Sequence, residues 1–269
     1  MPISDFQAQV LKQIAANRSP ESYLAGATVL HRGDDTPRFS QDLDFFHDVE
    51  DRVAQSAEQD AATLRDAGYD FAWLLRTPTF HRAIITTDKQ QLKIEWAQDS
   101  AFRFFPVQLD AQCGYRLHDA DAATNKILAL AGRNEVRDFV DILHLHKTYL
   151  SLGAMAWAAC GKDPGFTPDF LLDHAGRHTA HSQADLDRLQ LRQPLNLKSL
   201  KQDWFSALGQ ARTLVAALPP DDIGCLYLGT DQTPITPDPT SNGFPACTRH
   251  RGGLRGVWPT VSPYDATGR

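Results

Sequence analysis

The sequence predicts an α/β (α+β) protein, with a mixed sheet and helices in a first lobe, an all-helical second lobe and a disordered tail. Three observations support this prediction. Short apolar segments fill residues 1–115, helical periodicity dominates residues 116–228, and residues 229–269 are rich in Pro, Gly and Thr without any periodicity. Single hydrophobic cores stop growing at roughly 250–300 residues, so two lobes are the better division of this 269-residue chain.

Composition excludes several classes of protein. With 42% hydrophobic and 22% charged residues the chain is of ordinary globular type, and no apolar run reaches the roughly 18 residues of a membrane span. Residues 1–18 lack the basic start and apolar run of a secretory signal, and the four cysteines are too far apart for a disulfide framework or zinc ribbon. We therefore expect a soluble, cytoplasmic protein with no membrane partner.

The first lobe is predicted from the apolar pattern of its segments. Apolar residues at helical spacing predict a helix over residues 3–17, which the Ser19-Pro20 pair ends. Two further helices are expected, at residues 28–31 and 50–67. Apolar segments between polar, Gly or Pro breaks predict strands at residues 23–25, 42–46, 71–75, 80–86 and 92–96. Together these elements make a mixed sheet with helices.

Helical spacing continues through the second lobe. Helices are expected at residues 122–131, 135–150, 169–175 and 197–217. Gly132 lies where the first of these ends and suits a helix stop, because glycine takes left-handed backbone angles without strain. From residue 229 the sequence offers too little apolar surface to offset the entropy of ordering, so the tail is predicted to be disordered.

The segment FSQDLDFF carries the first chemical signal. Residues two apart in a strand project from the same face, so Asp42 and Asp44 present two carboxylates to one spot while Leu43 enters the core. Mg²⁺ prefers oxygen ligands and commonly takes one or two carboxylates plus substrate phosphates, so the pair suits a nucleotide-bound metal. Taken alone, two aspartates at this spacing are more often a solvated strand end.

Two other segments strengthen this interpretation. In YLAGATVL, Gly26 follows a short strand and precedes a helix start, where a phosphate can approach free amide groups, and Thr28 adds a hydroxyl. In LKIEW, apolar residues alternate with Lys93 and Glu95, so Glu95 is a strand carboxylate that could lie beside the aspartates. The simpler interpretations are a tight turn for Gly26 and a solvent-facing carboxylate for Glu95.

The order of these segments resembles the nucleotidyltransferase superfamily. A strand that ends at Gly26 is followed by RFSQDLDFF and then by the strand carboxylate of LKIEW. Downstream, NKILALAGRNEVRDFVDILHL resembles the helical signature of the AbiEii/AbiGii-type toxins, which include the MenT toxins. The resemblance runs from about residue 23 to 145, and similar helix spacing continues to about residue 228. Three separated motifs in one order are more specific than any one of them.

The resemblance implies roles for individual residues. Asp42, Asp44 and Glu95 are expected to bind two Mg²⁺ ions, which activate the acceptor hydroxyl and stabilise the leaving pyrophosphate. Lys126 is expected to place a positive charge on the triphosphate, and Asp141 to position that lysine or the base. The other residues expected to bind the nucleotide are Gly26, Ala27, Thr28, Arg38 and Ser40. Arg133, Arg137 and Asp138 are expected to be structural partners.

Several of these positions have a second interpretation. Arg137 and Asp141 are four apart on a predicted helix and could form an ordinary surface ion pair. His144 and His146 point to different sides of that helix, so we assign no metal site to them. Ala27 stands where the family commonly has Gly or Ser, and its methyl group is expected to crowd the phosphate loop or require a different backbone angle.

The function implied by the resemblance is that of a magnesium-dependent nucleotidyltransferase, the toxin of a toxin–antitoxin pair. Such an enzyme transfers a nucleoside monophosphate from a nucleoside triphosphate to an acceptor hydroxyl, such as the 3′ end of tRNA or another RNA, and a separate antitoxin protein neutralises it. The net charge of −6 argues against bulk nucleic-acid binding and leaves a small-molecule acceptor as one alternative. The other alternative is a non-catalytic interaction protein. The departure from the family pattern at Ala27 favours it, whereas the presence of all three carboxylates argues against it.

Overall fold

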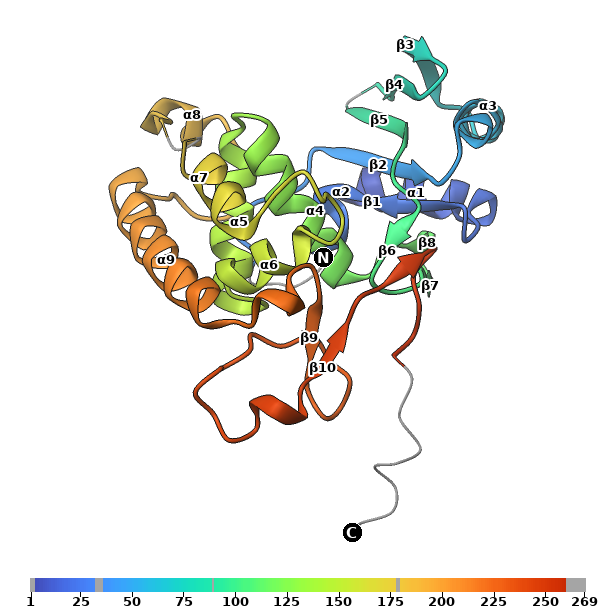
Figure 1. Cartoon of the computed structure of the whole chain (residues 1–269). Helices are drawn as coiled ribbons and strands as arrows, with labels where there is room; N and C mark the ends of the chain where they lie inside the picture. Colours follow the sequence, from blue (N-terminus) through green and yellow to red (C-terminus); the bar gives the residue numbers. More distant parts are fainter. Residues whose placement is uncertain (1–2, 32–35, 89, 178–179, 260–269) are drawn as a thin grey trace.

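The computed structural model describes residues 3–31, 36–88, 90–177 and 180–259. Two hydrophobic clusters divide the elements into a sheet lobe and a helical lobe, which lie beside each other in Figure 1. The two clusters interleave between Phe104 and Ala122. The predicted boundary at residue 115 falls within this segment, which we call the crossing between the lobes.

A mixed seven-stranded sheet dominates the first lobe, with strand order β3-β4-β5-β2-β1-β8-β7. Its strands are β1 Ser22–Ala25, β2 Asp42–His47, β3 Asp70–Thr77, β4 Phe80–Thr86, β5 Gln91–Gln98, β7 Gln108–Asp110 and β8 Gly114–Arg116. β2 pairs with β5 in parallel, and β1 with β8, while the other neighbours are antiparallel. All five predicted strands are therefore present.

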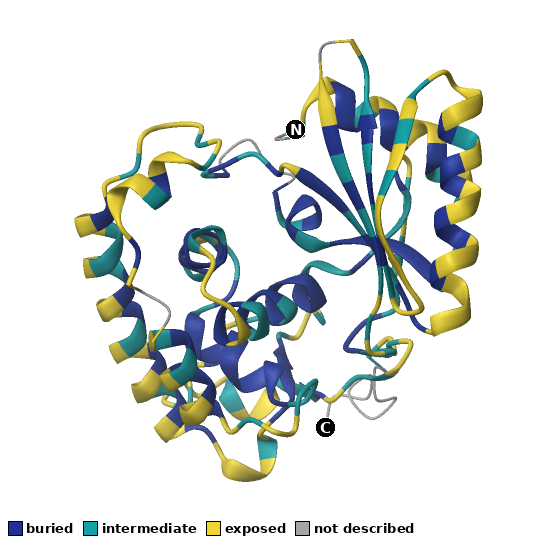
Figure 2. Cartoon of the chain, turned by 90° about the horizontal axis from the view of Figure 1, so that it is seen from above, coloured by how far each residue is buried: buried dark blue, intermediate teal, exposed yellow. Residues whose placement is uncertain are grey.

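One face of this sheet is apolar and the other is charged. The buried apolar residues of the central strands are Leu43, Phe45, Ile94 and Trp96. They share a core with helices α1 (Asp5–Ile14) and α3 (Glu50–Asp66), and Figure 2 shows α3 buried on its inner side and exposed on its outer side. Because side chains alternate along a strand, Asp42, Asp44 and Glu95 lie on the opposite face, toward the helical lobe.

Most helices belong to the second lobe, and all those predicted from periodicity are present. The remaining helices are α2 Gly26–Leu30, α4 Asp119–Gly132, α5 Val136–Thr148, α6 Leu152–Ala159, α7 Pro168–Arg177, α8 Gln183–Asp187 and α9 Leu197–Ala217. Every residue of α6 is buried, and α4, α7 and α9 pack against it. The sequence did not predict α6, because a helix that is apolar all round shows no amphipathic period. No helix in the described ranges is long and apolar enough to cross a membrane.

The prediction of a disordered tail is wrong for residues 229–259. There β10 (Thr248–His250) pairs with β9 (Leu226–Leu228), and β11 (Gly253–Leu254) pairs with β6 (Phe102–Arg103) near the crossing between the lobes. Figure 1 shows this last segment running beneath both lobes. Short strands of two or three residues carry no periodic signal, so composition alone gave the wrong result. The rest of the tail lies outside the described residues.

Candidate active site

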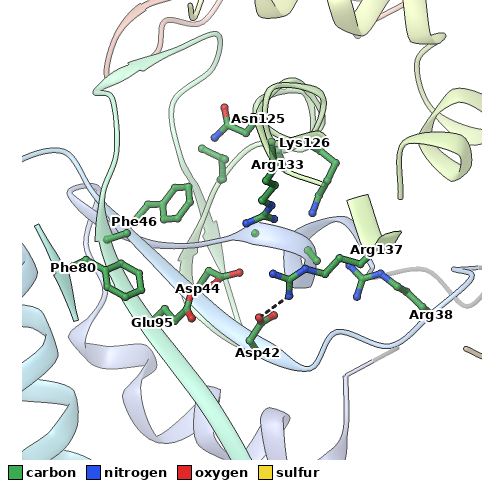
Figure 3. Close-up of a pocket in the computed structure, with 16 residues that line it drawn as sticks. Arg38, Asp42, Asp44, Phe46, Phe80, Glu95, Asn125, Lys126, Arg133 and Arg137 are labelled. Atoms are coloured by element: carbon green, nitrogen blue, oxygen red, sulfur yellow. Dashed lines mark hydrogen bonds and ion pairs between the residues drawn. The ribbon is translucent and has the colours of Figure 1, made fainter. Parts of the chain in front are cut away.

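A cavity of about 270 Å³ lies between the charged face of the sheet and helices α4 and α5 (Figure 3). Asp42 and Asp44 of β2 and Glu95 of β5 line it from the sheet side. In the parallel register of these strands Asp44 stands opposite Glu95. The structure thus brings together the three carboxylates that the sequence singled out.

Gly26 places the start of α2 directly against Asp44. Its φ is +65°, and a Cβ at this position would lie 2.0 Å from Asp44 Oδ2. Only glycine permits both this backbone angle and this approach without strain. The tight turn predicted for Gly26 is therefore present. Ala27 lines the same cavity and is 6% exposed, so the fold accommodates the methyl group that departs from the family pattern.

Asp44 is the acid of the three whose negative charge is least compensated by neighbouring cations and donors. Burial raises the pKa of its carboxyl, and the nearby Asp42 and Glu95 carboxylates raise it further, to about 7. No residue of the described ranges forms a hydrogen bond or ion pair with this side chain. A cation in the cavity would relieve both the desolvation and the repulsion, so the position suits a metal ligand.

Asp42 and Glu95, in contrast, are neutralised by cations of the chain. Lys93 Nζ lies 3.0 Å from Asp42 Oδ2 and 2.9 Å from Glu95 Oε1. Arg137 Nη1 of α5 donates to Asp42 Oδ2 at 3.2 Å, and Arg82 Nε of β4 donates to Glu95 Oε1 at 2.7 Å. Burial opposes ionisation of Asp42, but Lys93 and Arg137 outweigh it and hold the pKa of this carboxyl below its usual value.

The helical side of the cavity is organised by Asp141. This residue of α5 is 1% exposed, accepts hydrogen bonds of 2.7 and 2.6 Å from Arg38, and lies 3.1 Å from Lys126 Nζ. Burial opposes its ionisation, yet Lys126 and Arg38 lower the pKa of Asp141 well below the usual value. Asp141 therefore contacts Lys126 directly, and its role in positioning this lysine for a nucleotide stays a prediction. The alternative of a surface ion pair between Arg137 and Asp141 is wrong.

The cationic wall is larger than the sequence suggested. Arg133 and Arg137, expected only as structural partners, both line the cavity with Arg38 and Lys126. Asp138 is fully buried and holds Lys126 Nζ at 2.9 Å and Arg133 Nε at 2.6 Å. Lys93 and Arg82 were missed as well, since the contacts that place them at the carboxylates depend on which strands become neighbours.

Thr28 and Ser40 lie beneath the cavity and do not line it. Both hydroxyls are buried, and they donate to the backbone carbonyl of Asp42 at 2.9 and 3.2 Å, respectively. They therefore fix the start of β2, and through it the position of the Asp42 side chain. Their predicted contact with a triphosphate stays a prediction.

The donor set fits a hard divalent cation, although the acids do not enclose one as they stand. No group of three His, Cys, Asp or Glu side chains in the described chain is arranged to hold a metal. Two of the three acids are instead drawn to Lys93, Arg82 and Arg137. The fit rests on three carboxylates facing one cavity, where Asp44 accepts no hydrogen bond from the part of the chain that the structure describes. Carboxylate oxygens are the ligands that Mg²⁺ prefers.

Known proteins that resemble this chain include a family of nucleotidyltransferase toxins. A family model described as "Nucleotidyl transferase AbiEii toxin, Type IV TA system" matches residues 9–221. The nucleotidyltransferase toxin MenT4 from Mycobacterium tuberculosis H37Rv is similar in structure, with a TM-score of 0.57 and 17% identity, covering 80% of this chain and 83% of that chain. JHP933 from Helicobacter pylori has a TM-score of 0.51 and 21% identity, covering 80% and 95%, respectively. No curated protein matches. At these identities the solved structures show a shared fold alone.

Proposed function

The chain belongs to the AbiEii nucleotidyl transferase toxin family, and from this premise we propose that it transfers a nucleoside monophosphate from a magnesium-bound nucleoside triphosphate to an acceptor hydroxyl. One observation carries the proposal. The same cavity has three carboxylates on its sheet side and four cationic side chains on its helical side. A metal-bound polyphosphate is a ligand that matches both walls, because the metal pairs with the acids and the phosphates pair with the cations.

The metal would be held by Asp42, Asp44 and Glu95, and we propose two ions. When bound, they lower the pKa of the attacking hydroxyl and neutralise charge on the reacting phosphate and leaving group. Asp44 supports this assignment because its carboxylate faces the cavity with no donor among the described residues. Gly26 supports it too, since the backbone of α2 approaches this carboxylate more closely than any larger residue permits.

The triphosphate would lie against the helical wall. The cationic residues that line this wall are Arg38, Lys126, Arg133 and Arg137. Buried Asp138 and Asp141 hold three of them in place before any ligand arrives, so little reorganisation is needed on binding. Apolar side chains line the rest of the cavity and suit the base and ribose of a nucleotide; they include Phe46, Phe80, Ala97 and Leu117.

In the proposed reaction, the acceptor oxygen forms a bond to the α-phosphorus while the bond between that phosphorus and the pyrophosphate oxygen breaks. The acceptor hydroxyl gives up its proton to solvent water, and pyrophosphate leaves with the electron pair of the broken bond. Lys126 and Arg137, which line the cavity, would stabilise the charge that grows on the leaving group. Phe46 and Phe80 line the cavity and would help to displace water once a nucleotide is bound.

Transfer of label tests the proposal directly. Purified protein with Mg²⁺ and radiolabelled nucleoside triphosphates is expected to label an RNA pool. Asp44→Ala is expected to abolish labelling while the circular dichroism spectrum stays unchanged. Asp203→Ala is the matched control, because Asp203 is a half-exposed acid on α9 that pairs with Lys147 outside the cavity. Labelling that survives in Asp44→Ala would refute the assignment of this cavity.

We propose an RNA 3′ end, tRNA among others, as the acceptor, a cytoplasmic location where these RNAs occur, and a separately encoded antitoxin protein as partner. Membership in a toxin family supports the antitoxin. A small hydroxyl compound is the alternative acceptor, which the net charge of −6 favours because nucleic-acid binding requires cationic surface. Competition between tRNA and small hydroxyl compounds for the label separates the two acceptors.

A further inference from the structure

Lys93 occupies an unusual position among the carboxylates. In the parallel register of β2 and β5 it stands opposite Asp42, and it lies two residues from Glu95 on the same face of β5. Its ammonium group bridges the two acids, at 3.0 Å from Asp42 Oδ2 and 2.9 Å from Glu95 Oε1. One cation thus joins carboxylates from two strands, as a divalent ion would.

Other cations of the chain reach the same oxygens from outside this pair. Arg137 approaches Asp42 Oδ2 at 3.2 Å from α5, and Arg82 approaches Glu95 Oε1 at 2.7 Å from β4. Among the described residues, Lys93 is the cation that contacts both acids. Its side chain is 31% exposed and has a flexible four-carbon stem, so the ammonium group can move out to solvent without any change in the backbone.

A metal ion and this ammonium group compete for the same carboxylates. Mg²⁺ binds carboxylate oxygens at about 2.0–2.1 Å, so an ion shared by Asp42 and Glu95 would stand within a few ångströms of Lys93 Nζ. Like charges at that distance repel strongly. The triphosphate changes the balance, because its negative charges offer Lys93 and Arg137 new partners once the metal has taken their acids.

We propose that Lys93 is a positioning residue that acts as an internal counter-ion. In the nucleotide-free enzyme its ammonium group occupies the position of the metal between the carboxylates, and it leaves that position when metal and triphosphate bind together. The inference rests on the proposed function, since it assumes that these carboxylates bind divalent metal. Its consequence is that a bare cation binds weakly and that the nucleotide makes metal binding tight. Between turnovers, the ammonium group also compensates the negative charges of the acids, so that they stay in place without repelling each other.

Metal affinity tests this role without reference to turnover. Binding of Mn²⁺ is measured from the electron paramagnetic resonance signal of the free ion, with and without a non-hydrolysable nucleoside triphosphate analogue. For the wild type we expect weak binding of Mn²⁺ alone and tight binding with the analogue. Lys93→Met is expected to bind Mn²⁺ alone at least about tenfold more tightly, the scale of removing a unit charge near the ion.

Two further variants make the result specific. Lys93→Gln, a second neutral replacement, should repeat the gain, while Lys93→Arg keeps the charge and should bind Mn²⁺ alone as weakly as the wild type. Lys147→Met is the matched control, because Lys147 pairs with Asp203 on the helical lobe and should leave the affinity unchanged.

The outcomes separate this inference from the proposed function. A gain of affinity in both neutral variants supports the counter-ion role, because loss of a merely structural contact would not improve binding. If the neutral variants bind Mn²⁺ alone no better than the wild type, while the analogue still makes wild-type binding tight, the role of Lys93 is overturned and the metal site stands. If the wild type binds no Mn²⁺ even with the analogue, the metal site itself is wrong.

Discussion

Substitution of Gly26 by alanine probes the contact on which the geometry of the site depends most closely. An added Cβ would lie 2.0 Å from Asp44 Oδ2, 2.8 Å from its Cγ and 3.0 Å from its Cβ. Rotation of the Asp44 side chain relieves the two shortest contacts, to Oδ2 and Cγ, but it turns the carboxylate out of its present orientation. Gly26→Ala should therefore displace a proposed metal ligand and strain the backbone at the same time.

The loss of stability and the loss of activity can be estimated separately. A left-handed backbone costs an L residue roughly 1–2 kcal/mol, and an off-rotamer side chain about 0.5–1.5 kcal/mol more. The expected loss of unfolding free energy for Gly26→Ala is thus about 2–3 kcal/mol. The effect on chemistry is of similar size, because a misplacement of about 1 Å at a reacting centre can reduce the rate about 100-fold, which corresponds to about 2.7 kcal/mol.

Gly68 supplies the control. Its φ is +86°, and a Cβ there would meet nothing within 4 Å, so Gly68→Ala incurs the backbone strain without the collision. Urea unfolding and label transfer are measured on both variants. We expect Gly68→Ala to lose about 1–2 kcal/mol and keep its activity, whereas Gly26→Ala loses more of both. Equal destabilisation, with wild-type transfer in Gly26→Ala, would show that the approach to Asp44 is unimportant.

Three further predictions concern the rest of the site and the fold. Asp141→Asn leaves buried cations without their acid, and it should lower the free energy of unfolding, measured in urea, by about 3–5 kcal/mol. Asp173→Asn is the control, because Asp173 forms an exposed ion pair with Arg212, and it should change this free energy little. Equal effects of the two substitutions would contradict the role of Asp141 as a buried partner. Because the pKa of Asp44 is raised from 3.8 to about 7, its contribution to stability is complete below the lower value and lost as pH rises through the higher one. Without metal, the melting temperature of the wild type should thus fall relative to Asp44→Asn across that window, and parallel curves would contradict the shift. A chain that ends at Ala246 lacks β10 and β11 and should melt at a lower temperature, whereas an unchanged melting curve would mean that the segment is dispensable.

The sheet and the acids were predictable because their signals are local. Alternation in DLDFF and LKIEW fixed which side chains share a face of a strand, and this needs no knowledge of the partner strand. The sequence could not show that Lys93 would stand beside Asp42, because the parallel pairing of β2 and β5 joins residues about fifty positions apart. Arg82 was not recognised as a neighbour of Glu95 because that contact depends on the register of the antiparallel pair β4 and β5.

The cationic wall was harder to predict for a different reason. Helical spacing showed that Arg137 and Asp141 share a face of α5, and a surface pair was then the simplest interpretation. The fold buries Asp141 instead, and a buried carboxylate requires partners wherever they come from. Arg38 and Lys126 meet this need from two other segments of the chain. The burial of this one acid therefore determines contacts that helical periodicity alone could not predict.

These contacts also join the two lobes. The segment before β2 carries Arg38, which reaches Asp141 on α5, while Arg137 of the same helix reaches back to Asp42. Backbone hydrogen bonds reinforce the junction, from Phe39 N to the Gln190 carbonyl at 2.9 Å and from Arg192 N to the Pro37 carbonyl at 3.0 Å. The charges that would bind metal and phosphate therefore also fix the distance between the walls that hold them. Loss of activity in a site variant must for this reason be compared with its stability before it is assigned to chemistry, and the gain of metal affinity expected for Lys93→Met is informative because damage to the lobe contact cannot produce it.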